Sequence, residues 1–133
     1  MEQQKITDDI EEDIMTQFRK VSAELVKKNI DLGDLKVKQM NLQAALDIKK
    51  YAYIEEANDA KDPIDGKQRY KNQELRDAYV FRMMSTLDGT KEKHTTDEQA
   101  TKLTYDIEGL TFKFKCLKTI IDYNSSENYA KGA

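Results

Sequence analysis

The chain has 133 residues, of which 35% are charged and 38% hydrophobic, with one proline, five glycines and no tryptophan. This composition is typical of long solvated helices and argues against a sheet-rich fold, so we expect a single all-α domain over residues 1–133. The net charge of −3 is too balanced to predict a nucleic-acid or membrane partner from bulk electrostatics.

The first predicted helix covers residues 7–59. Within residues 14–53, apolar side chains recur in alternating steps of four and three, a period near 3.5 residues that indicates a helix packed along another helix. Poor helix formers gather at residues 29–34 around Gly33. The apolar register continues through them, so we expect a kink there; two separate helices are the alternative.

A second apolar stripe lies beside the first on this helix. Its residues are Val26, Ile30, Val37, Met40 and Ala44, and it continues to Ile48 and Tyr51. A hairpin covers only one side of its long helix, so this stripe predicts an interface with another subunit or with the N-terminal third of the chain folded back. We favour a homodimer or a larger helical oligomer.

Residues 59–71 interrupt the helical pattern. Pro63 cannot donate a backbone hydrogen bond, and Gly66 follows an aspartate in a turn pair, so the chain reverses here. A short helix is predicted over residues 72–86, beginning at an asparagine N-cap. A second turn is predicted at residues 88–94, because an Asp-Gly pair is followed by a polar run.

The third predicted helix covers residues 95–124. Thr95 and Glu98 have the spacing of a capping box, and residues 125–133 are expected to form a flexible tail. The apolar stripe of this helix consists of Ala100, Leu103, Ile107, Leu110, Phe114, Leu117 and Ile121, with Phe112, Cys116, Ile120 and Tyr123 as a flank. Gly109 lies on the same side, where it either admits a neighbouring backbone or is simply tolerated.

The lengths of these helices predict an antiparallel, coiled-coil-like helical hairpin. The second and third helices together match the first in length, and the turn at Pro63 sends them back beside it. The return arm is broken in two at the Asp88-Gly89 turn.

No residue pattern predicts catalysis. His94 is the only histidine and is expected on a surface turn, and Cys116 is expected to be a small core residue rather than a nucleophile. No hydrolase, zinc-protease, phosphate-loop or dinucleotide motif occurs. We therefore expect a protein that is not an enzyme and has no cofactor, metal or small-molecule substrate.

The stretch 67–82 combines basic and aromatic side chains. Candidate nucleic-acid contacts are Lys67, Arg69, Tyr70, Lys71, Arg76 and Arg82. Basic groups interleaved with aromatics can bind a phosphate backbone and stack bases. The alternative is that these cations pair with acids of the long helix and that Tyr79 belongs to the core.

The expected compartment is the cytoplasm. A single cysteine requires no oxidising compartment, and residues 1–13 are polar and acidic where a signal peptide would be basic and then apolar. No run approaches the roughly 18 apolar residues of a membrane-spanning helix, so no membrane partner is expected.

One short pattern begins at the end of the long helix and is followed by the heptad-patterned third helix. It consists of Tyr53, Glu55, Glu56 and Ala57, the loop Asp65-Gly66-Lys67, and Lys71-Asn72 followed by Arg76 and Ala78. With this pattern, residues 35–121 resemble small all-helical proteins of unassigned function encoded by tailed phages and prophages. The segment through Lys28 lies outside the resemblance. The resemblance implies a phage accessory protein in the host cytoplasm, of a kind often encoded beside replication and recombination genes.

The functional expectation is a non-enzymatic helical interaction protein that self-associates and binds a host or viral protein, such as a host enzyme or defence complex. The alternative is a nucleic-acid-binding factor that assists recombination or replication through residues 67–82. The partner's identity and the oligomer number do not follow from the sequence.

Overall fold

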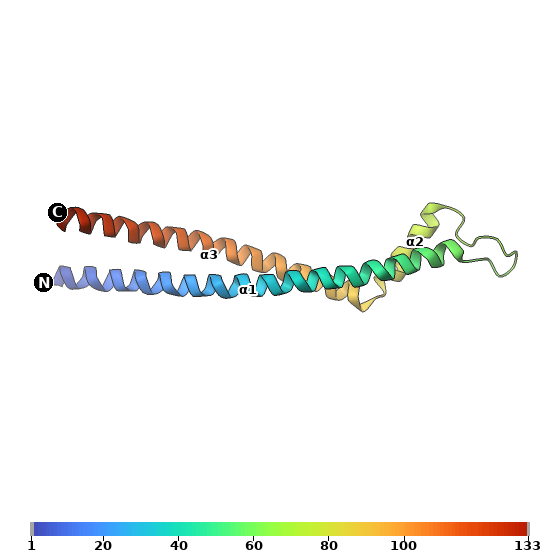
Figure 1. Ribbon diagram of the computed structural model, residues 1–133, viewed down its shortest axis with the longest axis horizontal. Helices are drawn as coiled ribbons and strands as arrows, with labels where there is room; N and C mark the ends of the chain where they lie inside the picture. The colour runs from blue at the N-terminus through green and yellow to red at the C-terminus, as the bar shows by residue number, and fades with distance from the viewer. Residues whose placement is uncertain (1, 133) are drawn as a thin grey trace. The chain divides into compact units, whose positions relative to one another are not determined.

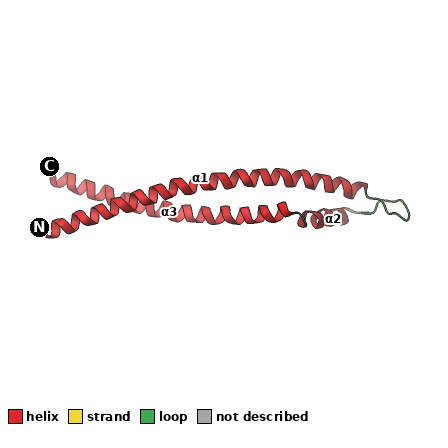
Figure 2. Ribbon diagram, turned by 90° about the horizontal axis from the view of Figure 1, so that it is seen from below, coloured by secondary structure: helices red, strands yellow, loops and turns green. Residues whose placement is uncertain are grey.

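The computed structural model describes the backbone of residues 2–132 and the side chains of residues 13–127. Its helices are α1 (Glu2–Asp59), α2 (Gln73–Ser85) and α3 (Asp88–Gly132) (Figure 1). The described backbone contains no strand, and its only β-type pairing is an isolated bridge between Lys61 and Gln68 (Figure 2). The protein is therefore all-α.

The chain divides into two compact units. Unit 1 contains the residues up to Gly33 and those from Thr101 onward, and unit 2 is Asp34–Ala100. The division falls within α1 and within α3, so each unit contains part of both helices. On α1 it coincides with Gly33, the centre of the segment with poor helix propensity. The helix runs through this segment without a break, which excludes two separate helices.

In unit 1, α1 and α3 pack through apolar side chains. Phe18 and Phe114 stack with ring centroids 4.8 Å apart, and Val21 and Leu117 are buried. Further along, the Lys28 ammonium lies 3.9 Å from the Asp106 carboxylate. Across these contacts the α3 residue number falls as the α1 residue number rises.

Unit 2 is formed by the second half of α1, the loop, α2 and the first turns of α3. Its buried residues are Leu46, Ala57, Val80, Thr96 and Ala100. At Gly89 an added Cβ would lie 3.4 Å from Leu46 Cδ2, so the start of α3 passes close to α1 there. Gly89, in the first turn of α3, therefore lies beside Leu46 with room for a Cβ in van der Waals contact.

The loop and α2 follow from local chemistry. Gly66 has φ +68°, the left-handed conformation that glycine adopts without steric cost, and its amide donates to the Asp62 carbonyl. Asn72 is the N-cap of α2, because its Oδ1 accepts a hydrogen bond from the Leu75 amide at 2.9 Å. Thr86 is the C-cap.

The third helix begins at Asp88 rather than at residue 95. The connection to α2 consists only of Thr86 and Leu87, so the expected turn at 88–94 is the first part of α3. Thr95 consequently does not cap a helix, and its hydroxyl donates to the Lys91 carbonyl four residues earlier at 3.1 Å. A threonine inside a helix bonds back in this way when it has no free amide to accept from.

Both long helices extend beyond their predicted ends. α1 begins at Glu2 instead of residue 7, and α3 continues past Asn124 to Gly132. Ser, Glu, Ala and Lys in residues 125–131 provide no helix breaker, so the expected tail is helical. Met1 and Ala133 lie outside the described residues. No helix within the described part is both long and apolar enough to cross a membrane.

Candidate interaction surfaces

Within unit 2, α1 has an inner face that packs on its own chain. Along Asp34–Asp59 this face consists of the buried or half-buried residues Leu35, Gln39, Leu42, Leu46, Tyr53 and Ala57. They recur in heptad-like steps of four, three, four, seven and four, as the sequence predicts for a helix packed along another helix, and Lys49 between Leu46 and Tyr53 is exposed. Gln39 is the polar member of this face.

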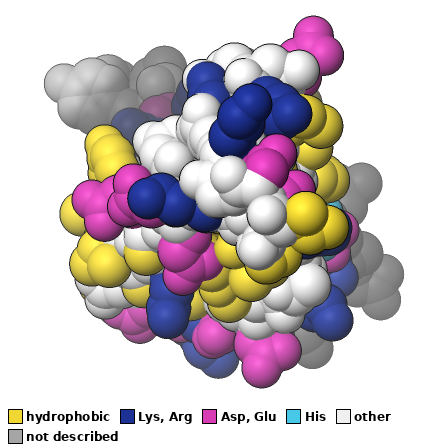
Figure 3. All heavy atoms as spheres, turned by 90° about the vertical axis from the view of Figure 1, so that its right-hand side faces the viewer, with side chains coloured by type: hydrophobic (Ala, Val, Ile, Leu, Met, Phe, Trp, Pro, Cys, Tyr) yellow, Lys and Arg dark blue, Asp and Glu magenta, His cyan; other side chains and the backbone are white. Residues whose placement is uncertain are grey.

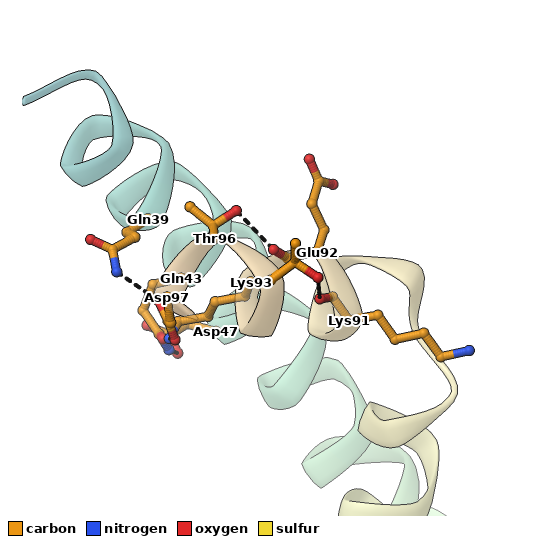
Figure 4. Close-up of polar contacts among 9 residues, drawn as sticks. Gln39, Gln43, Asp47, Lys91, Glu92, Lys93, Thr96 and Asp97 are labelled. Carbon is orange, nitrogen blue, oxygen red and sulfur yellow. Dashed lines mark hydrogen bonds and ion pairs between the residues drawn. The ribbon is translucent and has the colours of Figure 1, made fainter. Parts of the chain in front are cut away.

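Gln39 belongs to a polar layer between α1 and α3 (Figure 4). Its Nε2 donates to the Asp97 carboxylate at 2.7 Å, and the Lys93 ammonium donates to the same carboxylate at 2.8 Å. The bond from Lys93, followed by that from Gln39, lowers the pKa of Asp97 below its usual range. The ammonium of Lys38, the residue before Gln39, lies 3.4 Å from the Glu92 carboxylate. This layer orients α1 relative to α3 within unit 2.

The opposite side of α1 in unit 2 is also apolar, and we refer to it as the α1 outer face. It consists of Val37, Met40, Ala44, Ile48 and Tyr51. Their exposed fractions are 57% for Val37 and 71% for each of Met40, Ile48 and Tyr51, and Ala44 is exposed as well. At about 100° per residue, this face lies roughly 170° from the inner face. α1 is therefore apolar on two opposite sides.

Val26 and Ile30, the other two residues of the predicted interface, lie in unit 1. Their side chains are 62% and 60% exposed. α1 is continuous from Glu2 to Asp59, so the N-terminal third of the chain does not fold back over these two side chains.

Five of the basic and aromatic side chains of residues 67–82 form a cluster in unit 2, which we call the tyrosine ladder: Arg69, Tyr70, Arg76, Tyr79 and Arg82. Tyr70 and Tyr79 have ring centroids 4.9 Å apart, with the Arg69 guanidinium 5.6 Å from the Tyr70 centroid and the Arg82 guanidinium 5.8 Å from the Tyr79 centroid. Arg76 donates to the Tyr70 carbonyl at 3.2 Å. The aromatic rings and three of the arginines are thus engaged with one another.

Tyr79 also connects the ladder to α1. Its hydroxyl donates to the Glu56 carboxylate at 2.8 Å, and this bond, with burial as a lesser cause, raises the pKa of Tyr79. The remaining candidates, Lys67 and Lys71, are exposed. On the face of the molecule that Figure 3 presents, Lys and Arg side chains lie among Asp, Glu and hydrophobic ones and form no continuous basic surface.

A groove of about 650 Å³ lies in unit 2 between α1, α2 and the start of α3. It is lined by Gln43, Leu46, Asp47, Lys50, Ile54, Asp77, Val80, Phe81, Met84 and Thr90. Asp47 and Asp77 each accept a hydrogen bond from a glutamine one turn earlier on their own helix. The aliphatic and aromatic members of the lining, such as Leu46, Ile54 and Phe81, are suited to hydrophobic contact.

Two residues occupy positions that differ from the predictions. His94 lies inside α3 and not on a turn; its Nε2 is 3.0 Å from the Glu98 carboxylate, and both side chains are well exposed. Cys116 is exposed and not a core residue. Over the side chains that the structure describes, no group of three or more His, Cys, Asp or Glu could hold a metal ion.

The flank that contains Cys116 is predicted to belong to the core but is exposed. Phe112 and Tyr123 are 72% and 68% exposed, and Tyr105, on the same side, is 68% exposed. The signal was present in the sequence as a second heptad-like series, but periodicity alone does not distinguish a covered face from an uncovered one.

Comparison with known protein families, characterised proteins and solved structures gives no match to this chain.

Proposed function

We propose that this protein is a non-enzymatic helical interaction module that self-associates through the α1 outer face. The observation that carries the proposal is the exposure of Val37, Met40, Ile48 and Tyr51 on the side of α1 that faces away from its own core. The proposed architecture is an antiparallel helical hairpin in which α2 and α3 return along α1.

A contiguous row of exposed apolar side chains has a different meaning from single exposed ones. Single exposed hydrophobic residues are normal on soluble proteins, whereas a contiguous apolar strip marks an interaction surface. From Val37 to Tyr51 the strip spans about 21 Å of helix at about 1.5 Å per residue. Burial of each of its larger side chains contributes about 1.5–3 kcal/mol. The strip is therefore long enough to support helix–helix association.

A second copy of the chain is the occupant that the spacing favours. Val37, Met40, Ala44 and Tyr51 follow steps of three, four and seven, which places them at a and d positions of a coiled-coil seam, with Asp47 at the d position before Tyr51 and Ile48 beside it. In a parallel pair, the flanking residue Lys50 of one copy would face Glu55 of the other, so the charges are complementary. A host or viral protein with an amphipathic helix is the competing occupant.

Nucleic-acid binding is less well supported. The ring faces of Tyr70 and Tyr79 contact each other and the neighbouring guanidinium groups, so the bases of a nucleic acid would have to displace these contacts in order to stack. The exposed lysines of the loop have acidic neighbours at Asp62 and Asp65. The tyrosine ladder is therefore better explained as packing between the loop and α2.

The test is analytical ultracentrifugation of the full chain at micromolar concentrations. We expect a dimer or larger species, and a shift to smaller species when Met40→Glu and Ile48→Glu place two charges on the α1 outer face. The matched control is Ala45→Glu with Lys49→Gln, which makes the same change of −2 in net charge at exposed positions away from that face. Circular dichroism should give the same helix content for all three proteins.

A wild-type chain that sediments as a monomer at tens of micromolar would refute the proposal. Equal effects of the two double variants would also refute it, because a general charge effect would then explain the change. Binding of single-stranded DNA at low salt, lost with Arg69→Ala and Arg76→Ala, would favour the nucleic-acid alternative.

A further inference from the structure

A second exposed apolar series lies on α3, entirely within unit 1. Its members, which we call the α3 seam, are Tyr105, Gly109, Phe112, Cys116, Thr119 and Tyr123. They follow one another in steps of four and three, and all six are exposed. At about 100° per residue the seam lies roughly 160° from the α3 residues that face α1, such as Phe114 and Leu117. α3, like α1, is thus two-sided.

The seam has the pattern of a coiled-coil interface. Gly109, Cys116 and Tyr123 are each seven residues apart and occupy one heptad position, while Tyr105, Phe112 and Thr119 occupy the other. Neither Phe112 nor Tyr123 contributes to packing within unit 1, because they are 72% and 68% exposed. A helix that needed only to pack on α1 would have no use for this second set of apolar residues.

Gly109 supports the same conclusion. It lies in the middle of α3, where glycine disfavours the helix relative to alanine, and a Cβ at this position would meet nothing within 4 Å. The packing of unit 1 therefore does not require a glycine here. On the seam, between the rings of Tyr105 and Phe112, a residue without a side chain allows another helix to approach closely.

We propose that the α3 seam pairs with the α3 seam of a second copy, in parallel and in register, so that Cys116 of one copy faces Cys116 of the other. This inference rests on the proposed function, because it assumes that the protein self-associates, and it adds a second surface to the α1 outer face.

Charge determines the direction of the pair. In a parallel arrangement, Glu108 on one edge of the seam faces Lys113 on the opposite edge of the second copy, and the symmetry repeats this contact. In an antiparallel arrangement centred near Cys116, Lys115 faces Lys115 of the second copy, and Glu108 faces Asp122. Like charges would then oppose each other along the pair. The parallel arrangement brings like charges together only at Asp122 and Glu127, near the end of the seam.

Each chain then has two apolar surfaces for self-association, the α1 outer face in unit 2 and the α3 seam in unit 1, and each can pair with its own equivalent on another copy. Loss of one surface should therefore leave association through the other.

Thiol cross-linking tests the register. A short bismaleimide should join two full-length chains through Cys116, the only cysteine. In a Cys116→Ser background, Gly109→Cys and Tyr123→Cys should each cross-link to the same residue of a second copy. Lys118→Cys in that background is the control, because this exposed residue lies off the seam and should give at most a tenth of the dimer yield. Circular dichroism verifies that each variant is folded.

The outcomes separate this inference from the proposed function. An associating wild-type chain that forms no cross-linked dimer at Cys116 would overturn the α3 seam and leave the α1 outer face unaffected. Cross-linking between mixed Gly109→Cys and Tyr123→Cys chains, without cross-linking of either alone, would overturn the parallel direction. Persistent cross-linking at Cys116 in the Met40→Glu, Ile48→Glu variant supports the seam even where the α1 outer face is disabled.

Discussion

Phe114 and Phe112 lie two residues apart on α3 and provide a direct test of its two sides. Phe114 is half-buried and stacks on Phe18 with centroids 4.8 Å apart, whereas Phe112 is 72% exposed. Phe→Ala in a core costs about 3–5 kcal/mol, and an aromatic pair adds about 0.5–1.5 kcal/mol beyond its buried area. Because Phe114 is only half-buried, we expect Phe114→Ala to lower the free energy of unfolding by about 2–3 kcal/mol. Phe112→Ala should change the stability of the unassociated chain by no more than about 0.5 kcal/mol.

The assay is urea unfolding followed by circular dichroism at several protein concentrations. Phe114→Ala should lower the unfolding midpoint at every concentration, because it removes contacts within one chain. Phe112→Ala should instead reduce the dependence of the midpoint on concentration, because binding of a second copy stabilises only the folded state. Equal losses for the two variants at the lowest concentration would refute the distinction between an inner and an outer side of α3.

Further predictions concern local features of unit 2 and its boundary. The pKa of Asp97 is lowered by Lys93 and Gln39, so its carboxylate stabilises the fold above about pH 4, and this stabilisation is lost as the pH falls through the lowered pKa. In Asp97→Asn the free energy of unfolding should therefore depend less on pH in this acid range, as measured by urea unfolding at a series of pH values. Gly66→Ala should destabilise by about 1–2 kcal/mol in urea because φ is +68°, while Gly33→Ala, in an open helical position, should stabilise by about 1 kcal/mol. Asn72→Ala should cost about 1 kcal/mol by removing the α2 cap, with faster hydrogen exchange in α2 as the measurement and Asn72→Asp as the control.

The inner faces of the long helices could be predicted from the sequence. The four-three spacing identifies Val21, Leu46 and Leu117 as core residues, and all three are buried. This succeeds because a helix packed along another helix imposes one regular period on its contacts. The cap at Asn72 is equally local, since it depends only on an asparagine and the amide three residues later.

The start of α3 could not be predicted in the same way. An Asp-Gly pair is a strong turn signal, but the chain has already turned at Thr86 and Leu87, and Gly89 lies in the first turn of α3 beside Leu46. The local pattern does not show that the turn is complete before the Asp-Gly pair. The capping-box pattern at Thr95 failed for the same reason, because the helix was already continuous there.

The exposure of Cys116 illustrates a different limit of prediction from apolar periodicity. A series of apolar residues at heptad spacing predicts that a helix face is covered, but it does not identify what covers it. On α1 the first stripe accounts for the core, so the second stripe predicts an interface. On α3 the corresponding series is predicted to be a flank of the core, although the same reasoning applies to it. Polar residues at its edges, such as Glu108 and Lys113, were the available sign that this side faces outward.

The polar layer explains how a helix with two apolar faces selects the one that turns inward. Val37 and Met40 could pack on α3 as readily as the inner face if burial of apolar surface alone decided the orientation of α1, since hydrophobic attraction is not directional. Hydrogen bonds are directional, and the bond from Gln39 to Asp97 at 2.7 Å forms only when the inner face is turned toward α3. With the outer face turned inward, Asp97 would lose Gln39 and face apolar side chains. A single polar layer can specify register in helical assemblies in this manner. The same pair of residues that closes unit 2 around its core therefore leaves the α1 outer face available to a second copy.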